Sequence, residues 1–379
     1  MISFKLTEEQ EQIRKLARSF AEKEIIPIAA EYDEKEEIPW HIVEKAHALG
    51  LMNRTVPVEY GGQGLDHVTD AIVAEELAYG CLGISGALGA NGLALAPILI
   101  AGTPEQKEKF LKPFCAKPQL AAFCLTEPNA GSDVASISTT AVRDGDYYVI
   151  NGRKCFITNG GIASLYTVFA TVDKSKGLKG ITAFIVPGDT PGISMGRKEK
   201  KMGDRASHVA EVIFEDVRVP KENVLWSEGQ GFKIAMMTLD RTRPIVGAAA
   251  VGVARRALEE AIKYSKQRVQ FGKPICENQA IQFMLADMAT KVETARLLVW
   301  YACWLLDQGL PVSKIGAMAK MYAADVAMSV TVDAVQIFGG YGYMRDYPVE
   351  KLMRDAKILQ IYEGTNQIQR IVIARNLLA

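Results

Sequence analysis

The residues with the clearest chemical potential lie near the C-terminus, where positions 361–367 read IYEGTNQ. Glu363 is a carboxylate between an aromatic ring and a glycine, in a segment otherwise poor in acid. Such surroundings can raise the pKa of a carboxyl group and make it a base. Gly364 permits close approach of a ligand to the backbone, while Thr365 and Gln367 supply hydrogen-bonding groups. On these residues alone, a helix end with a solvated glutamate is the more common explanation of such a run.

Three further segments precede this run in a fixed order. They read LTEPNAGSD at 125–133, FITNGG at 156–161 and QIFGG at 336–340. Together with the run around Glu363, they make the chain resemble the acyl-CoA dehydrogenases over essentially its whole length. The resemblance implies a flavoprotein that contains FAD, oxidises an acyl-CoA thioester and passes electrons to an electron-transfer flavoprotein.

The resemblance also implies how the reaction would run. Glu363 would remove the alpha proton of the thioester while the beta hydrogen leaves as hydride to flavin N5, on the opposite face of the substrate. The backbone N–H of Glu363 or Gly364 would polarise the thioester carbonyl. Some relatives place the base on the helix that here carries Thr242, which cannot serve as a base, so Glu363 stands without a rival.

No GxGxxG follows a predicted strand and no GxxxxGK[ST] occurs, so a Rossmann or Walker site is not supported. The resemblance instead implies a flavin held by residues of the central and C-terminal segments: Phe123, Leu125, Thr126, Ser132, Phe156, Thr158, Thr365 and Gln367. Thr126 and Ser132 could instead close turns, and Phe156 could belong to an ordinary core.

The resemblance further implies that a neighbouring subunit completes each flavin site. The residues concerned are Arg268 and Phe271, with Gln336, Gly339 and Gly340. Arg268 would reach the flavin pyrophosphate with its bidentate guanidinium, which implies a dimer and a homotetramer built as a dimer of dimers. The alternative for Arg268 is a charge that interacts with a helix C-terminus.

The CoA portion would contact Ser132, Asp240, Arg243, Tyr362 and Gly364, although a structural salt bridge explains Asp240 and Arg243 equally well. The acyl group would lie along the uncharged stretch 81–94, against Leu88 and Asn91. A lone asparagine there could instead cap a helix or meet a backbone carbonyl. The missing charge disfavours a dicarboxylic substrate, and the small residues leave room for a bulky group.

Several substrates therefore remain compatible with the resemblance. They are a short- or medium-chain straight acyl-CoA, an alicyclic one such as cyclohexanecarboxyl-CoA, and a cyclic enoyl-CoA. An acyl-CoA oxidase shares most of the motifs but is usually longer. A scaffold without catalysis on the same fold is disfavoured because Glu363 is accompanied by Thr126, Ser132 and Thr158.

Composition excludes other classes of function. The 379 residues carry 44 basic and 44 acidic side chains, so binding to nucleic acid or an anionic membrane has no electrostatic basis. The six cysteines and four histidines are scattered without metal-ligand spacing, which indicates reduced thiols and no metal site. Acidic residues within the first ten positions disfavour a signal peptide, and the apolar run 93–100 is too short for a bilayer, so we expect a cytoplasmic protein.

The elements expected to position these residues form an α+β fold of three domains. We expect an N-terminal helical domain over 1–118, opened by a capping box of Thr7 and Gln10. A central β-barrel or sandwich should cover 119–228, with a hairpin turn at 151–152. Apolar residues at helical spacing over 251–262 and 281–299 predict a C-terminal four-helix bundle over 229–379.

Overall fold

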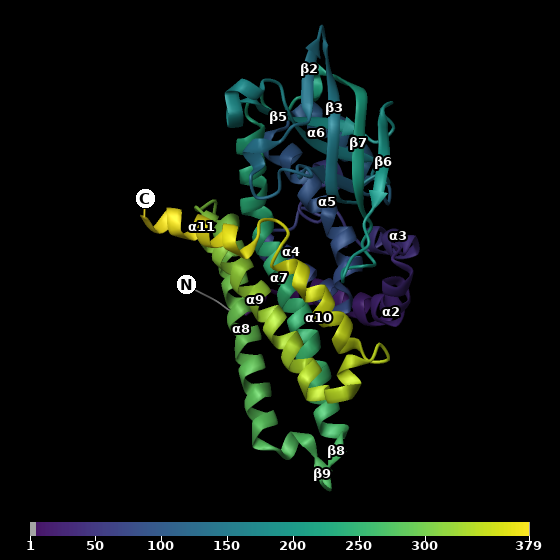
Figure 1. The fold of residues 1–379 in the computed structure, drawn as a ribbon, viewed down its shortest axis with the longest axis vertical. Coiled ribbons are helices and arrows are strands. Elements are labelled where there is room, and N and C mark those ends of the chain that lie inside the picture. Colours follow the sequence, from purple (N-terminus) through teal and green to yellow (C-terminus); the bar gives the residue numbers. More distant parts are fainter. Residues whose placement is uncertain (1–4, 379) are drawn as a thin grey trace.

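The chain folds into a helical unit, a β unit and a second helical unit in sequence order, in a computed structural model that describes residues 5–378 (Figure 1). This is the predicted α+β architecture. Residues 1–4, which belong to the segment considered for a signal peptide, lie outside the described residues, as does residue 379.

From residue 5 onward, the N-terminal unit contains six α-helices and one π-helical turn, with a short 3-10 turn at Val58–Tyr60. They are α1 (Glu8–Phe20), η1 (Ala21–Ile25), α2 (Ile26–Lys35), α3 (Trp40–Ala48), α4 (His67–Gly80), α5 (Leu82–Ala101) and α6 (Pro104–Cys115). The predicted capping box is confirmed, since the Thr7 and Gln10 side chains each bond the other's backbone N–H. The same reciprocal cap, formed by Thr103 and Gln106, starts α6.

Helix α5 is longer than the run 93–100 that the sequence analysis singled out. It and the span Ser313–Tyr343 are both long and apolar enough to cross a membrane by length and composition alone. In each, about half or more of the apolar window is buried inside the protein, as in the core helix of a soluble protein. The length argument against a spanning segment is therefore wrong for α5, and burial is the observation that explains its composition.

The β unit contains one seven-stranded sheet in the order β1-β4-β2-β3-β7-β6, with β5 paired to β4. The strands are β1 (Ala121–Cys124), β2 (Thr140–Asp144), β3 (Tyr147–Thr158), β4 (Leu165–Thr171), β5 (Ile181–Pro187), β6 (Ile193–Lys198) and β7 (Val209–Pro220). Alternate residues of β4 face two cores: Leu165 and Phe169 pack towards α5 and α6, whereas Tyr166 and Val168 share a core with β3 and β7. Because β4 and β7 contribute to one core, the sheet curls around it.

The predicted turn at Asn151-Gly152 is wrong. Strand β3 runs through these residues, and the hairpin turn lies between β2 and β3, where Gly145 adopts φ +61°. Gly152 instead marks a register shift between β3 and β7, because its backbone passes so close to Thr139 that a Cβ would lie 2.4 Å from the threonine hydroxyl. An Asn-Gly pair therefore made a bulge here and not a turn.

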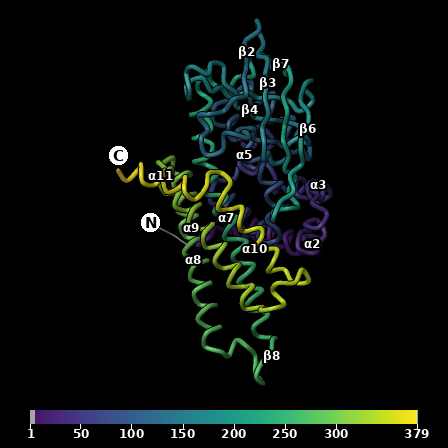
Figure 2. The backbone as a smooth tube through the Cα atoms, in the orientation of Figure 1, coloured from purple at the N-terminus to yellow at the C-terminus, as the bar shows by residue number. Residues whose placement is uncertain are grey.

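The C-terminal unit is a helical bundle with a small hairpin at its far end (Figure 2). Its elements are α7 (Gly231–Gln267), β8 (Val269–Gln270), β9 (Lys273–Pro274), α8 (Gln279–Asp307), α9 (Ser313–Phe338), α10 (Pro348–Leu359) and α11 (Asn366–Leu378). The predicted apolar series are confirmed: Val251, Ala254 and Ala261 of α7 are buried against Val292 and Val299 of α8 in one core. Helix α4 joins this core, so the two helical units pack together.

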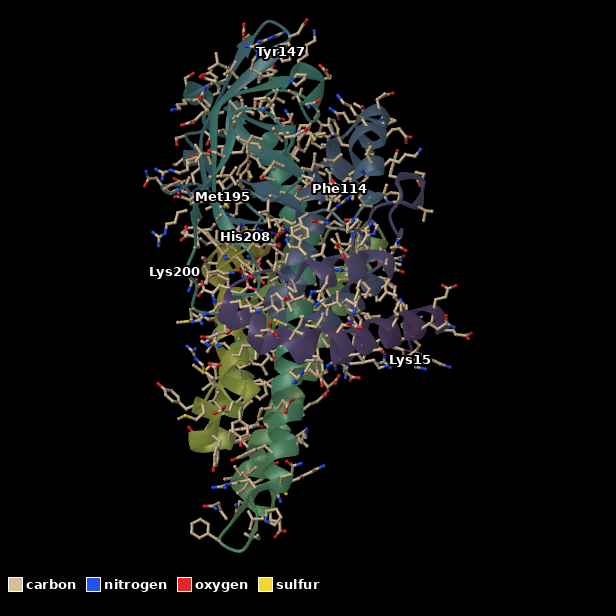
Figure 3. All side chains as sticks on the ribbon, turned by 90° about the vertical axis from the view of Figure 1, so that its right-hand side faces the viewer. Lys15, Phe114, Tyr147, Met195, Lys200 and His208 are labelled. Atoms are coloured by element: carbon tan, nitrogen blue, oxygen red, sulfur yellow. The ribbon has the colours of Figure 1, made fainter. Side chains whose placement is uncertain are left out.

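The β unit meets both helical units at one level of the molecule. Figure 3 shows Lys200 and His208 at this junction, in the loop that connects β6 to β7. His208 is buried and its Nε2 lies 2.9 Å from the carbonyl oxygen of Gly160. All six cysteines are free, and within residues 5–378 no group of three His, Cys, Asp or Glu side chains is arranged to hold a metal ion.

Candidate active site

A cavity of about 1540 Å³ lies where the three units meet. That volume exceeds the usual range of about 300–1,000 Å³ for a site that holds one small molecule, so two ligands can share it. Its walls come from α5, from β1 with the residues after it, from α7, and from the segment after α10. The predicted site residues that line it are Leu88, Phe123, Leu125, Thr126, Ser132, Phe156, Thr158, Arg243, Tyr362, Glu363, Gly364 and Thr365.

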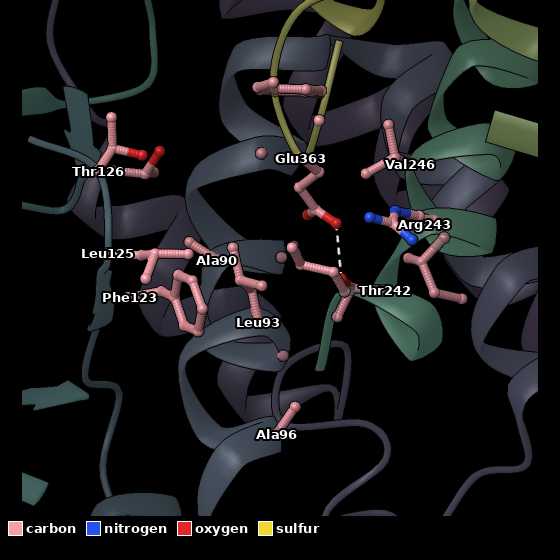
Figure 4. Close-up of a pocket in the computed structure, with 18 of the residues that line it drawn as sticks. Ala90, Leu93, Ala96, Phe123, Leu125, Thr126, Thr242, Arg243, Val246 and Glu363 are labelled. Atoms are coloured by element: carbon pink, nitrogen blue, oxygen red, sulfur yellow. Dashed lines mark hydrogen bonds between the residues drawn. The ribbon is translucent and has the colours of Figure 1, made fainter. Parts of the chain in front are cut away.

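Glu363 projects into this cavity from the turn between α10 and α11 (Figure 4). Its Oε2 accepts a hydrogen bond of 2.6 Å from the hydroxyl of Thr242 on α7. Burial raises the pKa of the Glu363 carboxyl, and the Thr242 bond and the charges of Lys320 and Arg243 reduce that increase. The side chain is thus a carboxylate with one fixed oxygen and a second oxygen available to a ligand.

The backbone at Glu363 and Gly364 has positive φ angles, and side chains of two neighbouring helices hold it in place by hydrogen bonds. Glu363 has φ +51° and Gly364 φ +92°, conformations that a non-glycine residue adopts at a cost. The buried Lys320 of α9 donates to the Gly364 carbonyl at 2.8 Å, and Gln369 of α11 donates to the same oxygen at 2.8 Å. Burial lowers the pKa of Lys320 to about 8. Two helices therefore fix the turn that aims the carboxylate.

The N–H groups of Glu363 and Gly364 donate to no acceptor within residues 5–378. Backbone donors left free beside a cavity are the usual way to stabilise a carbonyl oxygen that gains negative charge. Arg243 is nearby and almost fully buried, and its Nη1 donates to Asp240 at 2.8 Å. Asp240 itself lies outside the cavity lining, and its salt bridge to Arg243, formed within α7, orients the guanidinium.

Opposite Glu363 stands a wall built on and after β1, with Phe123, Leu125 and Thr126 facing the cavity (Figure 4). A buried ion pair supports this wall from behind: Lys154 Nζ donates to Glu127 at 2.8 Å and to the Leu125 carbonyl at 3.0 Å. Glu127 also accepts from the backbone N–H groups of Ser138 and Thr139. Burial raises the pKa of Glu127, but the Lys154 charge and these bonds outweigh it and set the pKa at about 2.

The wall fits a flavin ring. Phe123 and Leu125 give it an apolar surface, and the hydroxyls of Thr126, Ser132 and Thr158 have no hydrogen-bond partner within the described residues. Phe156 is 65% exposed with φ +56°, so an aromatic face is held out towards the cavity. This donor set, uncommitted to the protein, can bond the edge of a planar heterocycle.

Five predicted flavin contacts lie at the other end of the molecule. Arg268 and the fully exposed Phe271 belong to the β8–β9 hairpin region, and Gln336, Gly339 and Gly340 lie at the end of α9. The two groups adjoin, since the Arg268 guanidinium lies 5.3 Å from the Tyr341 ring centroid. None of them lines the cavity of the same chain, and neither does Gln367, which is exposed on α11.

The prediction that Asn91 faces the acyl group is corrected. Asn91 is fully buried and absent from the cavity wall. Its Nδ2 donates to Asn53 at 3.0 Å and to the Gln119 carbonyl at 2.9 Å, and its Oδ1 accepts from Ala121 N–H at 2.8 Å. These bonds join α5 to the loop between α3 and α4 and to the start of β1, which agrees with the structural alternative named above.

Sequence reasoning missed the roles of four buried polar residues: Lys320, Lys154, Glu127 and Asp204. A lone lysine within the apolar run 315–330 was a signal for Lys320, because a charge on a buried helix face needs a partner. Lys154 and Glu127 are distant in sequence, and Asp204 lies in a loop whose path no local pattern sets. The positions of these three depend on tertiary structure.

Comparison with known proteins agrees with this geometry. Family models match the chain in three parts: acyl-CoA dehydrogenase N-terminal domain over residues 7–118, middle domain over 122–217 and C-terminal domain over 229–378. The chain is 48% identical over 375 residues to the short-chain specific acyl-CoA dehydrogenase of Clostridium acetobutylicum. This match covers 98% of the present chain and 99% of the relative.

Two solved structures superpose over the full length of both chains. Butyryl-CoA dehydrogenase from Megasphaera elsdenii is 49% identical with a TM-score of 0.97. A chain from work on the electron transferring flavoprotein of Acidaminococcus fermentans and flavin-based electron bifurcation is 52% identical, also with a TM-score of 0.97. The chain therefore belongs to the acyl-CoA dehydrogenase family. It is an oxidoreductase and an FAD flavoprotein, in agreement with the uncommitted hydroxyls of the wall.

Proposed function

We propose that this protein dehydrogenates a short- or medium-chain acyl-CoA, straight or alicyclic, between its alpha and beta carbons, with Glu363 as the base. The observation that carries the proposal is the position of Glu363 across the cavity from the wall of Phe123, Leu125 and Thr126. A substrate between them would have the base on one face and, on the other, the wall whose residues would hold the flavin. Bound FAD supplies the two-electron acceptor for the hydrogen that leaves the beta carbon.

The residues of the chain prepare the alpha carbon for loss of its proton. Thr242 holds one oxygen of Glu363, so the other oxygen has a fixed direction. The free N–H groups of Glu363 and Gly364 can bond the thioester oxygen and stabilise the charge that develops as the proton leaves. Burial raises the pKa of Glu363, which makes the carboxylate a stronger proton acceptor.

Helix α5 supplies the acyl side of the cavity. A Cβ added to Gly89 or Gly92 would meet no atom within 4 Å, so the wall has free space beyond these glycines. This space supports an alicyclic acyl group as a second candidate beside a straight chain. The names of the Clostridium and Megasphaera relatives support the short straight chain.

As electron acceptor we propose an electron-transfer flavoprotein, on the basis of the similarity to the Acidaminococcus chain. We also propose a cytoplasmic homotetramer in which Arg268, Phe271, Gln336, Gly339 and Gly340 complete the flavin site of a neighbouring subunit. Their distance from the cavity of their own chain supports this arrangement.

The test is an anaerobic titration of the purified yellow protein with acyl-CoA esters. Butyryl-, hexanoyl- and cyclohexanecarboxyl-CoA should bleach the flavin absorbance. Each enoyl-CoA product should appear in an amount equal to that of the flavin reduced. Slow recovery of colour in air would support the dehydrogenase, whereas rapid recovery with hydrogen peroxide would identify an oxidase. A flavin that no acyl-CoA bleaches would overturn the proposal.

A further inference from the structure

One face of helix α4 lines the acyl side of the cavity. Asp70, Ala74 and Leu77, which are spaced by about one turn, all belong to the cavity wall. Helix α4 packs closely on α7, because a Cβ on Gly252 would lie 2.2 Å from the Glu75 carbonyl oxygen, and α5 follows α4 directly in the chain. The acyl side of the cavity is therefore bounded by α4 as well as by α5 and α7.

The surface of this α4 face changes from apolar to charged along the helix. Ala74 and Leu77 present only hydrocarbon, whereas Asp70 forms an ion pair with Arg54, in which Arg54 Nε donates to Asp70 Oδ1 at 2.5 Å. Both side chains of the pair line the cavity, and only 8% of the Arg54 side chain and 9% of the Asp70 side chain are exposed. The boundary of the acyl space thus contains a nearly buried ion pair.

Hydrogen bonds of the loop between α3 and α4 fix the guanidinium of this pair. Arg54 Nη1 donates to the Leu51 carbonyl at 3.1 Å. The neighbouring Asn53 accepts a hydrogen bond of 3.0 Å from Asn91 of α5 through its side-chain oxygen. A loop that is bonded to α5 therefore holds Arg54 against Asp70, and the pair keeps its position when a ligand fills the cavity.

The remaining polar atoms of the pair are open to solvent in the cavity. Arg54 Nη2 and Asp70 Oδ2 have no hydrogen-bond partner within the described residues, and neither atom is fully buried. Water can bond both atoms as long as the acyl group does not reach them. An apolar chain that reaches the pair would displace this water and offer no hydrogen bond in return, which is costly for groups that carry charge.

We propose that Arg54 and Asp70 are specificity-determining residues that limit the substrate to short or compact apolar acyl groups, because they form a polar boundary on the acyl side of the cavity. The inference rests on the proposed function. A pair with a structural role alone would affect all acyl-CoA esters alike, whereas a polar boundary affects only the esters that reach it. A buried ion pair can be replaced by apolar side chains of similar volume with little loss of stability, so both charges can be removed together.

The test measures kcat/KM for the straight-chain esters from butyryl- to dodecanoyl-CoA. Wild type should favour the short esters. Arg54→Met combined with Asp70→Leu should raise the ratio of the dodecanoyl to the butyryl value by about tenfold or more, because the long chain no longer covers charged groups. Methionine and leucine together fill no less volume than arginine and aspartate, so added space would not explain the increase.

Two controls separate the polar boundary from general effects of substitution. Arg218→Met combined with Asp144→Leu removes an exposed ion pair of the same two residue types from the β unit, outside the cavity wall, and should leave the ratio unchanged. Wild type alone also tests the inference, even if the Arg54 and Asp70 variants do not fold. For at least one chain of eight to twelve carbons, an ester with a terminal hydroxyl should have a higher kcat/KM than its parent, because the hydroxyl can bond the pair.

The outcomes are distinguishable from failure of the proposed function. If short esters bleach the flavin but dodecanoyl-CoA is oxidised as efficiently as butyryl-CoA by wild type, the cavity has no polar boundary. An unchanged ratio in the folded variant with methionine and leucine, or no preference for a terminal hydroxyl at any length, would overturn the inference too. If no ester bleaches the wild-type flavin, the proposed function itself fails.

Discussion

At the scale of single residues, the reactivity of Glu363 reflects a balance between burial and donors. Burial alone favours the protonated acid, whereas Thr242, Lys320 and Arg243 favour the carboxylate. Both effects are needed, because a base must be ionised before the reaction and must hold a proton after it. The Thr242 bond is the one direct contact in this set, so it is the part most open to experiment.

Glu363→Gln should leave FAD bound and abolish most dehydrogenation. The amide keeps the shape of the side chain but cannot accept the alpha proton, and the loss of a positioned base costs roughly 10²–10⁴ in rate. The measurement is the rate of anaerobic flavin bleaching by hexanoyl-CoA, with flavin content determined on the same sample. Bleaching at the wild-type rate would show that another group is the base.

Thr242→Val should shift the pH dependence of kcat/KM to higher pH. The hydroxyl stabilises the ionised form of Glu363, so its loss raises the pKa of the carboxyl, and a higher pH is then needed to keep the base ionised. Thr242→Ser, which retains the donor, should keep the wild-type profile. An acidic limb that stays in place in the valine variant would mean that the bond does not control the ionisation of Glu363.

Glu363 and the wall after β1 could be predicted from the sequence because each is formed by residues that are consecutive in the chain. The orientation of Asn91 could not be predicted, because an uncharged helix does not indicate which of its faces packs against β1. In the structure the Asn91 amide forms hydrogen bonds to Asn53 and Ala121. Lys320 shows the same limit, because its partners are Gly364, in the turn between α10 and α11, and Asn366, at the start of α11. The local sequence shows that such polar groups are present, but tertiary packing determines which partners they contact.

At the scale of elements, the wall of the cavity depends on strand β3. Lys154 is fully buried on β3 and joins the Leu125 carbonyl to Glu127, so the segment after β1 has a fixed path past the cavity. The sequence predicted helices, strands and their order from periodicity, because those patterns are local. It missed the β3 bulge at Gly152, which arises from contact with Thr139 and not from the Asn-Gly pair itself.

Lys154→Met should lower the free energy of unfolding by about 3 kcal/mol, the cost of leaving a buried carboxylate without its cation. It should also reduce flavin retention, because the wall loses its support. Glu127→Gln combined with Lys154→Met should recover part of the stability, since no buried charge is left unpaired. Chemical denaturation and flavin content on desalted protein measure both effects, and an unchanged unfolding midpoint would contradict them.

Because of the Lys154–Glu127 ion pair, we expect the stability of the fold to decrease at acidic pH. The pKa of Glu127 is about 2 in the fold and has a reference value of 4.5, so its stabilising effect is present above pH 4.5 and is lost as the pH falls towards 2. Glu127→Gln should show a weaker decrease in stability over this interval than wild type. Equal slopes in acid titrations of the two proteins would mean that Glu127 does not contribute.

At the scale of the whole molecule, the end remote from the β unit has an unexplained surface. Exposed apolar side chains gather there, around the β8–β9 hairpin and the end of α9: Val269, Phe271, Phe283, Tyr341, Tyr343 and Met344. Figure 1 shows β8 and β9 at the opposite end of the molecule from the labelled strands of the β unit. A large apolar surface of this kind is typical of an interface, and Arg268 lies within it.

Arg268→Ala should weaken both the binding of FAD and the association of subunits. If the guanidinium of one subunit binds the flavin pyrophosphate of another, its removal takes a charge-assisted hydrogen bond from the cofactor and from the interface at once. Size-exclusion chromatography with absorbance at flavin and protein wavelengths reports both on one sample. Arg143→Ala, an exposed change on β2, is the matched control and should retain cofactor and size. Full FAD occupancy in an unchanged oligomer of the Arg268 variant would remove the contact between subunits from the proposal.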